Sequence, residues 1–263
     1  TAPQEKSTDT SEGTHTADGT HVSIYSADDP CAPLPEYADG IAVFGCPLLG
    51  DETKQYEYYR AIAERTPDCR AIIRMPVISP KDPDRQIKYD QQIRAVFRAA
   101  SHGEPGILFP MITSVKEVER IKEICEEVKA ELRSDGIEYS DKIELGIMIE
   151  TPAAALISDR LAPMVDFFSV GTNDLTQYTL ACDRQNPDIE EFIDTHHEAI
   201  LRLIEMSAEN AHKNGAWIGI CGELAADTTL TERFLRMGID ELSVSPSFVL
   251  KVRDAVRRTD LSE

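Results

Sequence analysis

Eight short apolar segments alternate with longer helical segments along this chain, and this alternation limits the folds open to it. The short segments are rich in β-branched and aromatic residues, as buried strands are. They lie at 21–26, 40–44, 70–74, 106–110, 145–150, 167–170, 217–221 and 241–245. The stretches between them place apolar residues at helical spacing. Eight strands alternating with helices predict an α/β fold with a closed parallel sheet, the (β/α)8 TIM barrel.

The length of the chain suits one such barrel. It has 263 residues, and a barrel of this kind typically takes about 250. Residues 1–20 are rich in Ser, Thr, Asp and Gly with few apolar side chains, so we expect a flexible tail or linker there. Residues 21–263 then form a single domain. Because the sequence begins with Thr1 instead of Met, we expect a fragment or a processed product.

The composition excludes several kinds of partner. There are 27 Lys and Arg against 47 Asp and Glu, a net charge of −20, which repels nucleic acids and anionic membranes. No apolar run approaches the roughly 18 residues of a membrane span, and no signal-peptide pattern begins the chain. The six cysteines lie far apart without metal-ligand spacing, which favours reduced thiols and a cytoplasmic protein.

Polar or reactive side chains stand at the ends of three successive apolar strands. Glu150 ends the fifth strand. Asn173 and Asp174 follow the sixth strand, and Cys221 ends the seventh. One such residue alone is explained equally well as a helix cap. Because the carboxyl ends of parallel strands meet at one face, where α/β folds place their chemistry, the three together predict a functional site.

The residue types at these strand ends suit a metal ion and an anion. Glu150 and Asp174 end adjacent strands, so both can reach one ion, and carboxylate oxygens are ligands that Mg²⁺ prefers. The Asn173 amide can donate a hydrogen bond to a substrate oxygen. A lone buried cysteine is usually a small hydrophobic residue, but the position of Cys221 at a strand tip favours the role of an acid.

Three segments that contain these residues resemble one family. The segments are 147–155, 168–186 and 220–227, with the motifs Glu-Thr-Pro-Ala-Ala-Ala, Gly-Thr-Asn-Asp-Leu-Thr-Gln-Tyr-Thr-Leu and Cys-Gly-Glu-Leu. They are similar to the phosphoenolpyruvate-binding barrel of Enzyme I of the bacterial sugar phosphotransferase system. Pyruvate phosphate dikinase and phosphoenolpyruvate synthase share this barrel and the Gly-Thr-Asn-Asp and Cys-Gly-Glu motifs. The similarity is strong from about residue 93 to residue 258.

The resemblance implies a function and a role for each residue. It implies a domain that binds phosphoenolpyruvate with Mg²⁺ and releases pyruvate, with Glu150 and Asp174 as the metal carboxylates. The substrate-binding positions of the family correspond to Arg74, Asn173, Asp174 and Arg184. Two of these, Arg74 and Arg184, match arginines that bind the phosphate. Cys221 matches the cysteine that protonates the methylene carbon of enolpyruvate after the phosphoryl group has left.

The resemblance also implies partners. The family barrel is a dimerisation domain, so a homodimer is implied. The phosphorylated histidine of the family resides in a separate N-terminal domain, which in turn serves a phosphocarrier protein. No counterpart of that domain is visible in this sequence, so we expect that the chain alone does not complete the phosphotransfer reaction.

The first third of the sequence departs from the family pattern. Where the family has an arginine after the second strand, Phe44 is followed by Gly, Cys and Pro at 45–47. After Arg74, the family's Asp and paired glycines are replaced by 75–80, and only 81–89 stands where the family has a longer insertion with a further arginine. Each charge-assisted contact is worth about 1.5–3 kcal/mol, so the loss of two weakens phosphoenolpyruvate binding by about two orders of magnitude.

Two other functions fit the same residues. One is a catalytically impaired homologue that binds phosphoenolpyruvate, pyruvate or a similar oxyacid as a sensor or dimerisation module. The other is a metal-dependent lyase or aldolase that acts on a pyruvate enolate. Arg74, Arg184 and Cys221 separate the three functions, because a lyase has no need of Cys221 and a scaffold has no need of any of them.

Overall fold

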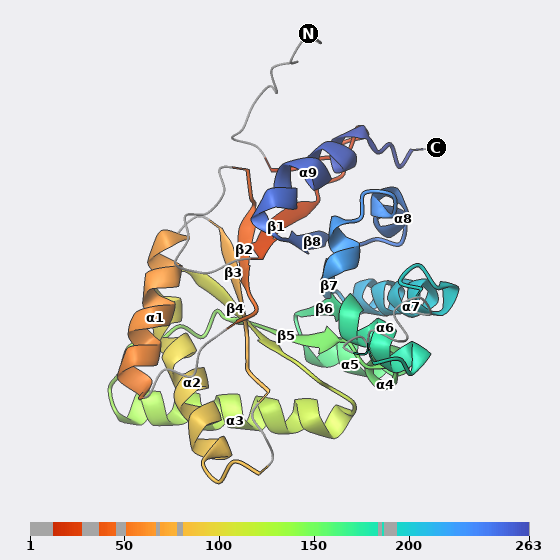
Figure 1. Ribbon diagram of the computed structural model, residues 1–263. Helices are drawn as coiled ribbons and strands as arrows, with labels where there is room; N and C mark the ends of the chain where they lie inside the picture. The colour runs from red at the N-terminus through yellow and green to blue at the C-terminus, as the bar shows by residue number, and fades with distance from the viewer. Residues whose placement is uncertain are drawn as a thin grey trace.

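The computed structural model describes residues 13–27, 37–45, 51–66, 69–77, 81–183, 186 and 194–262. Its parallel strands form a closed barrel in chain order, and β8 pairs with β1 to complete it (Figure 1). The strands are β1 (Ser23–Ala27), β2 (Gly40–Val43), β3 (Arg70–Arg74), β4 (Glu104–Phe109), β5 (Glu144–Ile149), β6 (Phe167–Gly171), β7 (Trp217–Cys221) and β8 (Glu241–Val244). The predicted TIM barrel is confirmed, and the predicted strand ends differ from those observed by at most two residues.

Helices follow the strands and surround the barrel, with α1 and α2 on one side and α7 and α8 on the other (Figure 1). The helices of the described ranges are α1 (Glu52–Arg65), α2 (Arg85–Ala99), α3 (Val115–Ser134), α4 (Pro152–Leu156), α5 (Ser158–Leu161), α6 (Thr172–Leu180), α7 (Glu198–Lys213), α8 (Thr231–Arg236) and α9 (Val249–Arg258). Short 3₁₀ helices lie at η1 (Ala100–His102), η2 (Ala162–Met164), η4 (Glu223–Ala226) and η5 (Pro246–Phe248).

Local signals fix where the helices beside the strand ends begin. Ser114 precedes α3, and Glu117 accepts the Ser114 N–H at 2.8 Å in a capping box. Thr151 precedes α4, and its Oγ1 accepts the Ala154 N–H at 3.1 Å. Pro152 occupies the first helical position, as the sequence predicts, because this position needs no N–H donor. The Thr151 side chain and the Pro152 ring therefore define the turn that follows Glu150.

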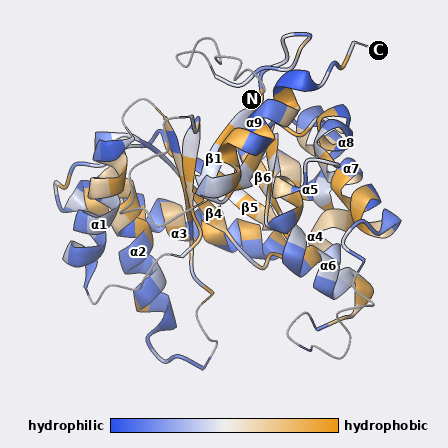
Figure 2. Cartoon of the chain, turned by 45° about the horizontal axis from the view of Figure 1, so that its top comes forward, coloured by the Kyte–Doolittle hydropathy of each residue, from blue (hydrophilic) through white to orange (hydrophobic). Residues whose placement is uncertain are grey.

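Two apolar cores result from the alternation of side chains along the strands. Phe168 points outward into the larger core between strands and helices, and Phe167 points into the barrel with Tyr25 and Met148. Gly146 makes room for Phe167, because a Cβ atom there would lie 2.3 Å from its ring. Figure 2 shows hydrophobic residues on the strands and on the sides of the helices that face them.

Charged residues close the barrel at the amino ends of the strands. The Arg70 Nε lies 2.9 Å from Oε2 of Glu144, and the Arg70 guanidinium lies 5.1 Å above the Trp217 ring. Glu241 is buried at the start of β8, and its Oε1 accepts a 2.6 Å hydrogen bond from the Ser243 hydroxyl. Burial raises the pKa of Glu241 to about 8, so its carboxyl group is mostly protonated at neutral pH.

Part of the expected flexible tail or linker, residues 13–17, contacts the rest of the chain. Thr14 is buried, and its hydroxyl donates to Asp39 Oδ2 at 3.1 Å. The Ala17 N–H donates to the Thr259 carbonyl at 2.8 Å, so this segment packs beside the end of α9. The rest of the predicted tail, residues 1–12, lies outside the described residues.

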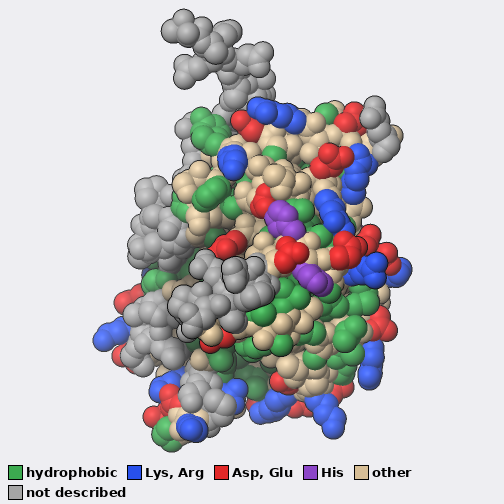
Figure 3. All heavy atoms as spheres, turned by 45° about the vertical axis from the view of Figure 1, so that its right-hand side comes forward, with side chains coloured by type: hydrophobic (Ala, Val, Ile, Leu, Met, Phe, Trp, Pro, Cys, Tyr) green, Lys and Arg blue, Asp and Glu red, His purple; other side chains and the backbone are tan. Residues whose placement is uncertain are grey.

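The surface carries the strong negative charge that the composition predicts. On the face shown in Figure 3, Asp and Glu side chains are interspersed with Lys and Arg over the helices. Many of these charges form surface pairs within one helix, such as Lys213 with Glu209 at 3.1 Å on α7. Pairs of this kind contribute little to stability, about 0.3–0.5 kcal/mol each. Within the described ranges, none of the helices combines the length and hydrophobicity that a membrane span needs.

Candidate active site at the carboxyl ends of the strands

A cleft of about 150 Å³ opens at the carboxyl ends of the barrel strands. Five of the six predicted site residues line it: Arg74, Glu150, Asn173, Asp174 and Cys221. The sixth, Arg184, lies outside the described residues. Residues from β3, β5, β6, β7 and the first turn of α6 therefore meet in one place, as the positions of these strand ends predict.

Glu150 is the most enclosed carboxylate of the cleft. Only 1% of its surface is exposed, and its Oε1 accepts a 2.6 Å hydrogen bond from the Met111 N–H. Burial raises the pKa of Glu150, and the neighbouring Asp174 carboxylate raises it further, while the Met111 N–H and Arg74 oppose the shift. Two carboxylates in contact repel each other when both are ionised, so the pair favours either a proton or a cation between its oxygens.

Glycines allow the carboxylate pair and the loops around it to come close together. A Cβ atom on Gly171 would lie 2.8 Å from Glu150 Oε2, so a side chain at the end of β6 would displace the carboxylate. Gly222 has φ of 99°, a conformation that favours glycine, and a Cβ atom there would lie 2.7 Å from Thr172 Oγ1. Both glycines therefore contribute to the shape of the cleft.

Asn173 is fixed by the loop that follows β7. Its Oδ1 accepts the Glu223 N–H at 3.2 Å, which directs its NH₂ group to be the donor for a ligand oxygen. The Thr172 hydroxyl donates to the Cys221 carbonyl at 3.0 Å and joins the same two strand ends. The first turn of α6 is thus held against the end of β7.

Cys221 is a buried thiol with weak polar contacts. Its Sγ accepts from the Ser169 hydroxyl at 3.5 Å and donates to the Val170 carbonyl at 3.4 Å. Burial raises the pKa of Cys221 to about 12, so the thiol keeps its proton at neutral pH. A thiol that retains its proton in the same cleft as a carboxylate pair is suited to deliver that proton to a carbanion or enolate.

Arg74 provides positive charge to the cleft. Its Nε and Nη2 donate to the Phe44 carbonyl at 3.1 and 2.8 Å, and its guanidinium lies 5.8 Å from the Phe44 ring centre. Among the described residues that line the cleft, it is the only one with a positive charge. The end of β2, where the sequence has no arginine, thus orients the arginine of β3.

Several residues of the site were not predicted. The alternation of β6, which turns Phe167 inward, also turns Ser169 inward and was a signal that could have found it. Met111 lies in the loop after β4, and nothing in its residue type indicates that its N–H holds Glu150. Met148 and Phe44 line the cleft as apolar residues without a sequence signal.

The donor set fits a hard cation with few protein ligands. Within the described part of the chain, no group of three or more His, Cys, Asp and Glu side chains is arranged to hold a metal. Glu150 and Asp174 form a pair, whose oxygen atoms suit an ion that takes its other ligands from water and substrate.

The fold and the cleft together define a TIM-barrel domain whose candidate site lies at the strand carboxyl ends. The sequence pattern of the family described as PEP-utilising enzyme, PEP-binding domain, matches residues 73–261. The chain belongs to this family.

Curated relatives of the chain are named phosphoenolpyruvate-protein phosphotransferase. The protein of Listeria monocytogenes is 48% identical over 172 residues, which cover 65% of this chain and 30% of that protein. The protein of Streptococcus equinus is 34% identical over 290 residues, 95% of this chain and 50% of that protein. Nearly the whole of this chain therefore aligns with about half the length of such a curated relative.

Solved structures with low sequence identity share the barrel. A malate synthase of Haloferax volcanii, solved as a lead(II) complex, aligns with a TM-score of 0.62 at 13% identity, covering 89% of this chain and 72% of that one. A citrate lyase of Burkholderia xenovorans aligns with a TM-score of 0.60 at 15% identity, covering 89% and 76%. At these identities the similarity shows the fold alone.

Proposed function

We propose that this chain is the phosphoenolpyruvate-binding domain of a phosphoenolpyruvate-protein phosphotransferase. The observation that carries the proposal is the meeting of Arg74, a carboxylate pair and a protonated thiol in one cleft of a chain that belongs to this family. The names of the curated relatives support the same reading. Neither a lyase nor a sensor is favoured by a specific observation, since the lyase-like structural neighbours share only the fold.

Glu150 and Asp174 are the residues that would hold Mg²⁺. They fit the ion, because they bring hard oxygen donors together. Burial raises the pKa of Glu150, and the Asp174 carboxylate raises it further through a repulsion that a cation relieves. When bound, the ion supplies Lewis-acid stabilisation of negative charge on a substrate oxygen.

The other side chains bind and orient the substrate. Arg74, already fixed by the Phe44 carbonyl, presents its remaining N–H donors to the phosphate. The NH₂ group of Asn173 donates to a substrate oxygen, with Oδ1 held by the Glu223 N–H. In the proposed reaction the bond between phosphorus and the enol oxygen breaks, and the phosphoryl group passes to a nitrogen of a histidine acceptor. The P–O electron pair stays on the enol oxygen, which leaves the enolate of pyruvate.

Cys221 then completes the reaction as the proton donor. Its Sγ–H bond breaks, the proton joins the methylene carbon to give pyruvate, and the electron pair remains on sulfur as a thiolate. The Ser169 hydroxyl already donates to Sγ, so it stabilises this thiolate until a proton returns from water. Pyruvate release therefore depends on the thiol, whereas substrate binding does not.

The partners belong to the proposal as well. The acceptor histidine would come from a phosphohistidine domain, which passes the phosphoryl group to a phosphocarrier protein. The greater length of the curated relatives is consistent with such a domain. We also propose a homodimer and a cytoplasmic location, both by analogy with the resemblance described above. The described chain on its own is proposed to bind the substrate without turning it over.

Calorimetric titration tests the proposal. Phosphoenolpyruvate is titrated into the wild type and Glu150→Gln, with and without Mg²⁺. We expect micromolar to sub-millimolar binding that requires both the ion and the Glu150 charge, and unchanged binding in Glu119→Gln, an exposed position on α3. Absence of binding at several millimolar in the wild type would overturn the proposal, and pyruvate and oxaloacetate would be the next ligands to titrate.

A further inference from the structure

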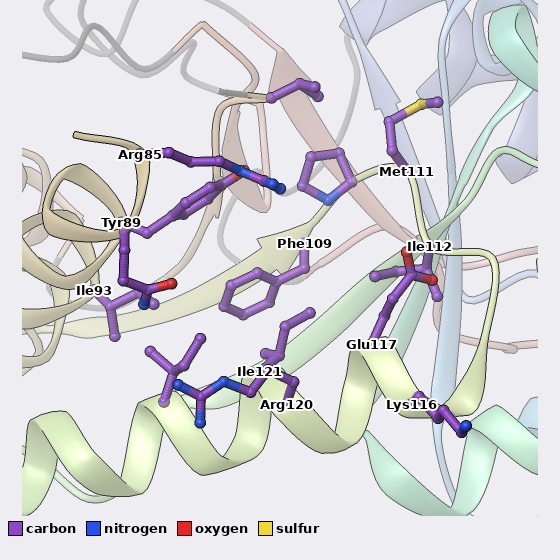
Figure 4. A pocket seen from close by; sticks show the side chains of 14 residues that line it. Arg85, Tyr89, Ile93, Phe109, Met111, Ile112, Lys116, Glu117, Arg120 and Ile121 are labelled. Carbon is purple, nitrogen blue, oxygen red and sulfur yellow. The ribbon is translucent and has the colours of Figure 1, made fainter. Parts of the chain in front are cut away.

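A second cleft, of about 400 Å³, lies outside the barrel between α2 and α3. Phe109, at the end of β4, lies at its centre (Figure 4). Tyr89 and Ile93 of α2 form one wall, and Ile121 and Ile124 of α3 form the other. Its volume is within the range of about 300–1,000 Å³ typical of small-molecule sites, and its surface is mostly apolar.

Two exposed cations stand at the ends of this cleft. Figure 4 shows Arg85 beside the Tyr89 ring at one end and Lys116 at the other. The Arg85 guanidinium lies 5.7 Å from the Tyr89 ring centre, and neither cation forms a salt bridge with an acidic side chain of the described residues. In a chain with a net charge of −20, cations without acidic partners beside an apolar surface favour an anionic ligand.

The remaining charges of the cleft are already engaged. Glu117 accepts the N–H groups of Thr113 and Ser114 at 2.8 Å each, and hydrogen bonds from both residues lower the pKa of Glu117 despite its partial burial. Arg120 pairs with Glu123 and Glu127 of its own helix, at 3.1 and 3.0 Å. The positive charge available to a ligand therefore comes from Arg85 and Lys116.

The loop after β4 separates this cleft from the candidate active site. Met111 and Ile112 line the cleft with their side chains. On the other side of the same loop, the Met111 N–H donates to Glu150 at 2.6 Å, and the Ile112 carbonyl accepts from Thr151 Oγ1 at 2.7 Å. Met111 has φ of 60°, a conformation that residues with side chains rarely adopt and that surrounding contacts must hold in place.

We propose that the cleft between α2 and α3 binds a small organic anion with an apolar body, and that its occupant acts on Glu150 through Met111. The apolar body rests on Phe109 and Ile121, and the anionic group pairs with Arg85. An occupant in contact with Met111 favours the loop conformation that holds Glu150. The regulatory meaning of this contact rests on the proposed function, whereas the binding itself does not.

A fluorescent anion and its neutral analogue test the binding. The probes are 8-anilinonaphthalene-1-sulfonate and N-phenyl-1-naphthylamine, which have the same aromatic body with and without a sulfonate. We expect Arg85→Gln to weaken the binding of the anionic probe about tenfold and to leave the binding of the neutral probe unchanged. Ile121→Trp, which fills the cleft, should abolish the binding of both.

Matched substitutions outside the cleft serve as controls. Arg202→Gln removes an exposed arginine of α7, and Leu250→Trp enlarges an exposed residue of α9. Both should bind the two probes as the wild type does. The proposed site would be overturned if Arg85→Gln and Ile121→Trp left anion binding unchanged, or if the control substitutions changed it equally.

Hydrogen–deuterium exchange tests the connection to Glu150. We expect the peptide that contains Met111 to exchange more slowly when the wild type is saturated with the anionic probe, and no such change in Ile121→Trp. Unchanged exchange in a wild type that binds the probe in the cleft would refute the action on Glu150. Because neither experiment contains phosphoenolpyruvate or a metal ion, failure here is distinguishable from failure of the proposed function.

Discussion

The buried Glu241 should make the stability of this barrel fall as pH rises. Its pKa of about 8 is above the ordinary value of 4.5, because burial disfavours the charged form. A group with a raised folded-state pKa contributes stability that is fully present below its unfolded pKa and is lost as pH rises through its folded pKa. The affected window therefore extends from about pH 4.5 to pH 8.

The size of the effect follows from the two pKa values. Each pKa unit between them is worth about 1.4 kcal/mol. The titration of Glu241 should therefore lower the free energy of unfolding of the wild type by about 3–4 kcal/mol between pH 5 and pH 8. Glu241→Gln keeps the shape of the side chain and an oxygen to accept the Ser243 hydroxyl, but it does not ionise. The variant should resemble the wild type at pH 5 and be more stable by about 3–4 kcal/mol at pH 8.

Urea unfolding at pH 5, 6, 7 and 8 measures this difference. Other titrating groups are shared by the two proteins, so the difference between their free energies of unfolding isolates Glu241. Glu119→Gln, at an exposed position, serves as the control and should change stability by less than about 0.5 kcal/mol at each pH. If the free energy of unfolding changed with pH in the same way for the wild type and Glu241→Gln, the reasoning would be refuted.

Three further substitutions test the site and the core. Gly171→Ala places a Cβ atom 2.8 Å from Glu150 Oε2. Calorimetry should then show Mg²⁺-dependent binding of phosphoenolpyruvate that is at least tenfold weaker, and unchanged affinity would contradict the close approach of Gly171 to Glu150. Cys221→Ser should still bind phosphoenolpyruvate, but pyruvate formation with an added phosphohistidine domain should fall by about 10²–10⁴-fold; an undiminished rate would exclude the thiol as the acid. Gly146→Ala puts a Cβ atom 2.3 Å from the Phe167 ring and should lower the free energy of unfolding by about 1–3 kcal/mol in urea, with a neutral effect arguing against this packing.

The barrel could be predicted because each strand carries its own signal. A run such as Phe167–Gly171 has no charged residue and is buried throughout, as a strand enclosed by helices and barrel interior must be. A charged residue precedes it, and a glycine ends it. The same regularity places Glu150, Asp174 and Cys221 at one face, since all parallel strands end there. These features depend on local sequence and on the symmetry of the fold.

What could not be predicted depends on contacts between distant segments. Polar composition predicts a tail at 13–20, but the Thr14 hydroxyl donates to Asp39, and Thr14 and Thr16 are buried. Likewise, the Phe44 carbonyl that orients Arg74 is a main-chain group, which every residue carries and no residue type reveals.

The hydrogen bond from Met111 to Glu150 has a consequence for how this site changes over evolutionary time. Because the donor is a main-chain N–H, random substitution at position 111 leaves it in place unless the new residue is proline, which lacks the hydrogen. The φ of 60° adds a preference for glycine or asparagine over β-branched residues. The hydrogen bond that orients the central carboxylate therefore does not depend on which side chain stands at position 111, whereas the backbone conformation and the contact with the second cleft restrict the residues that suit this position.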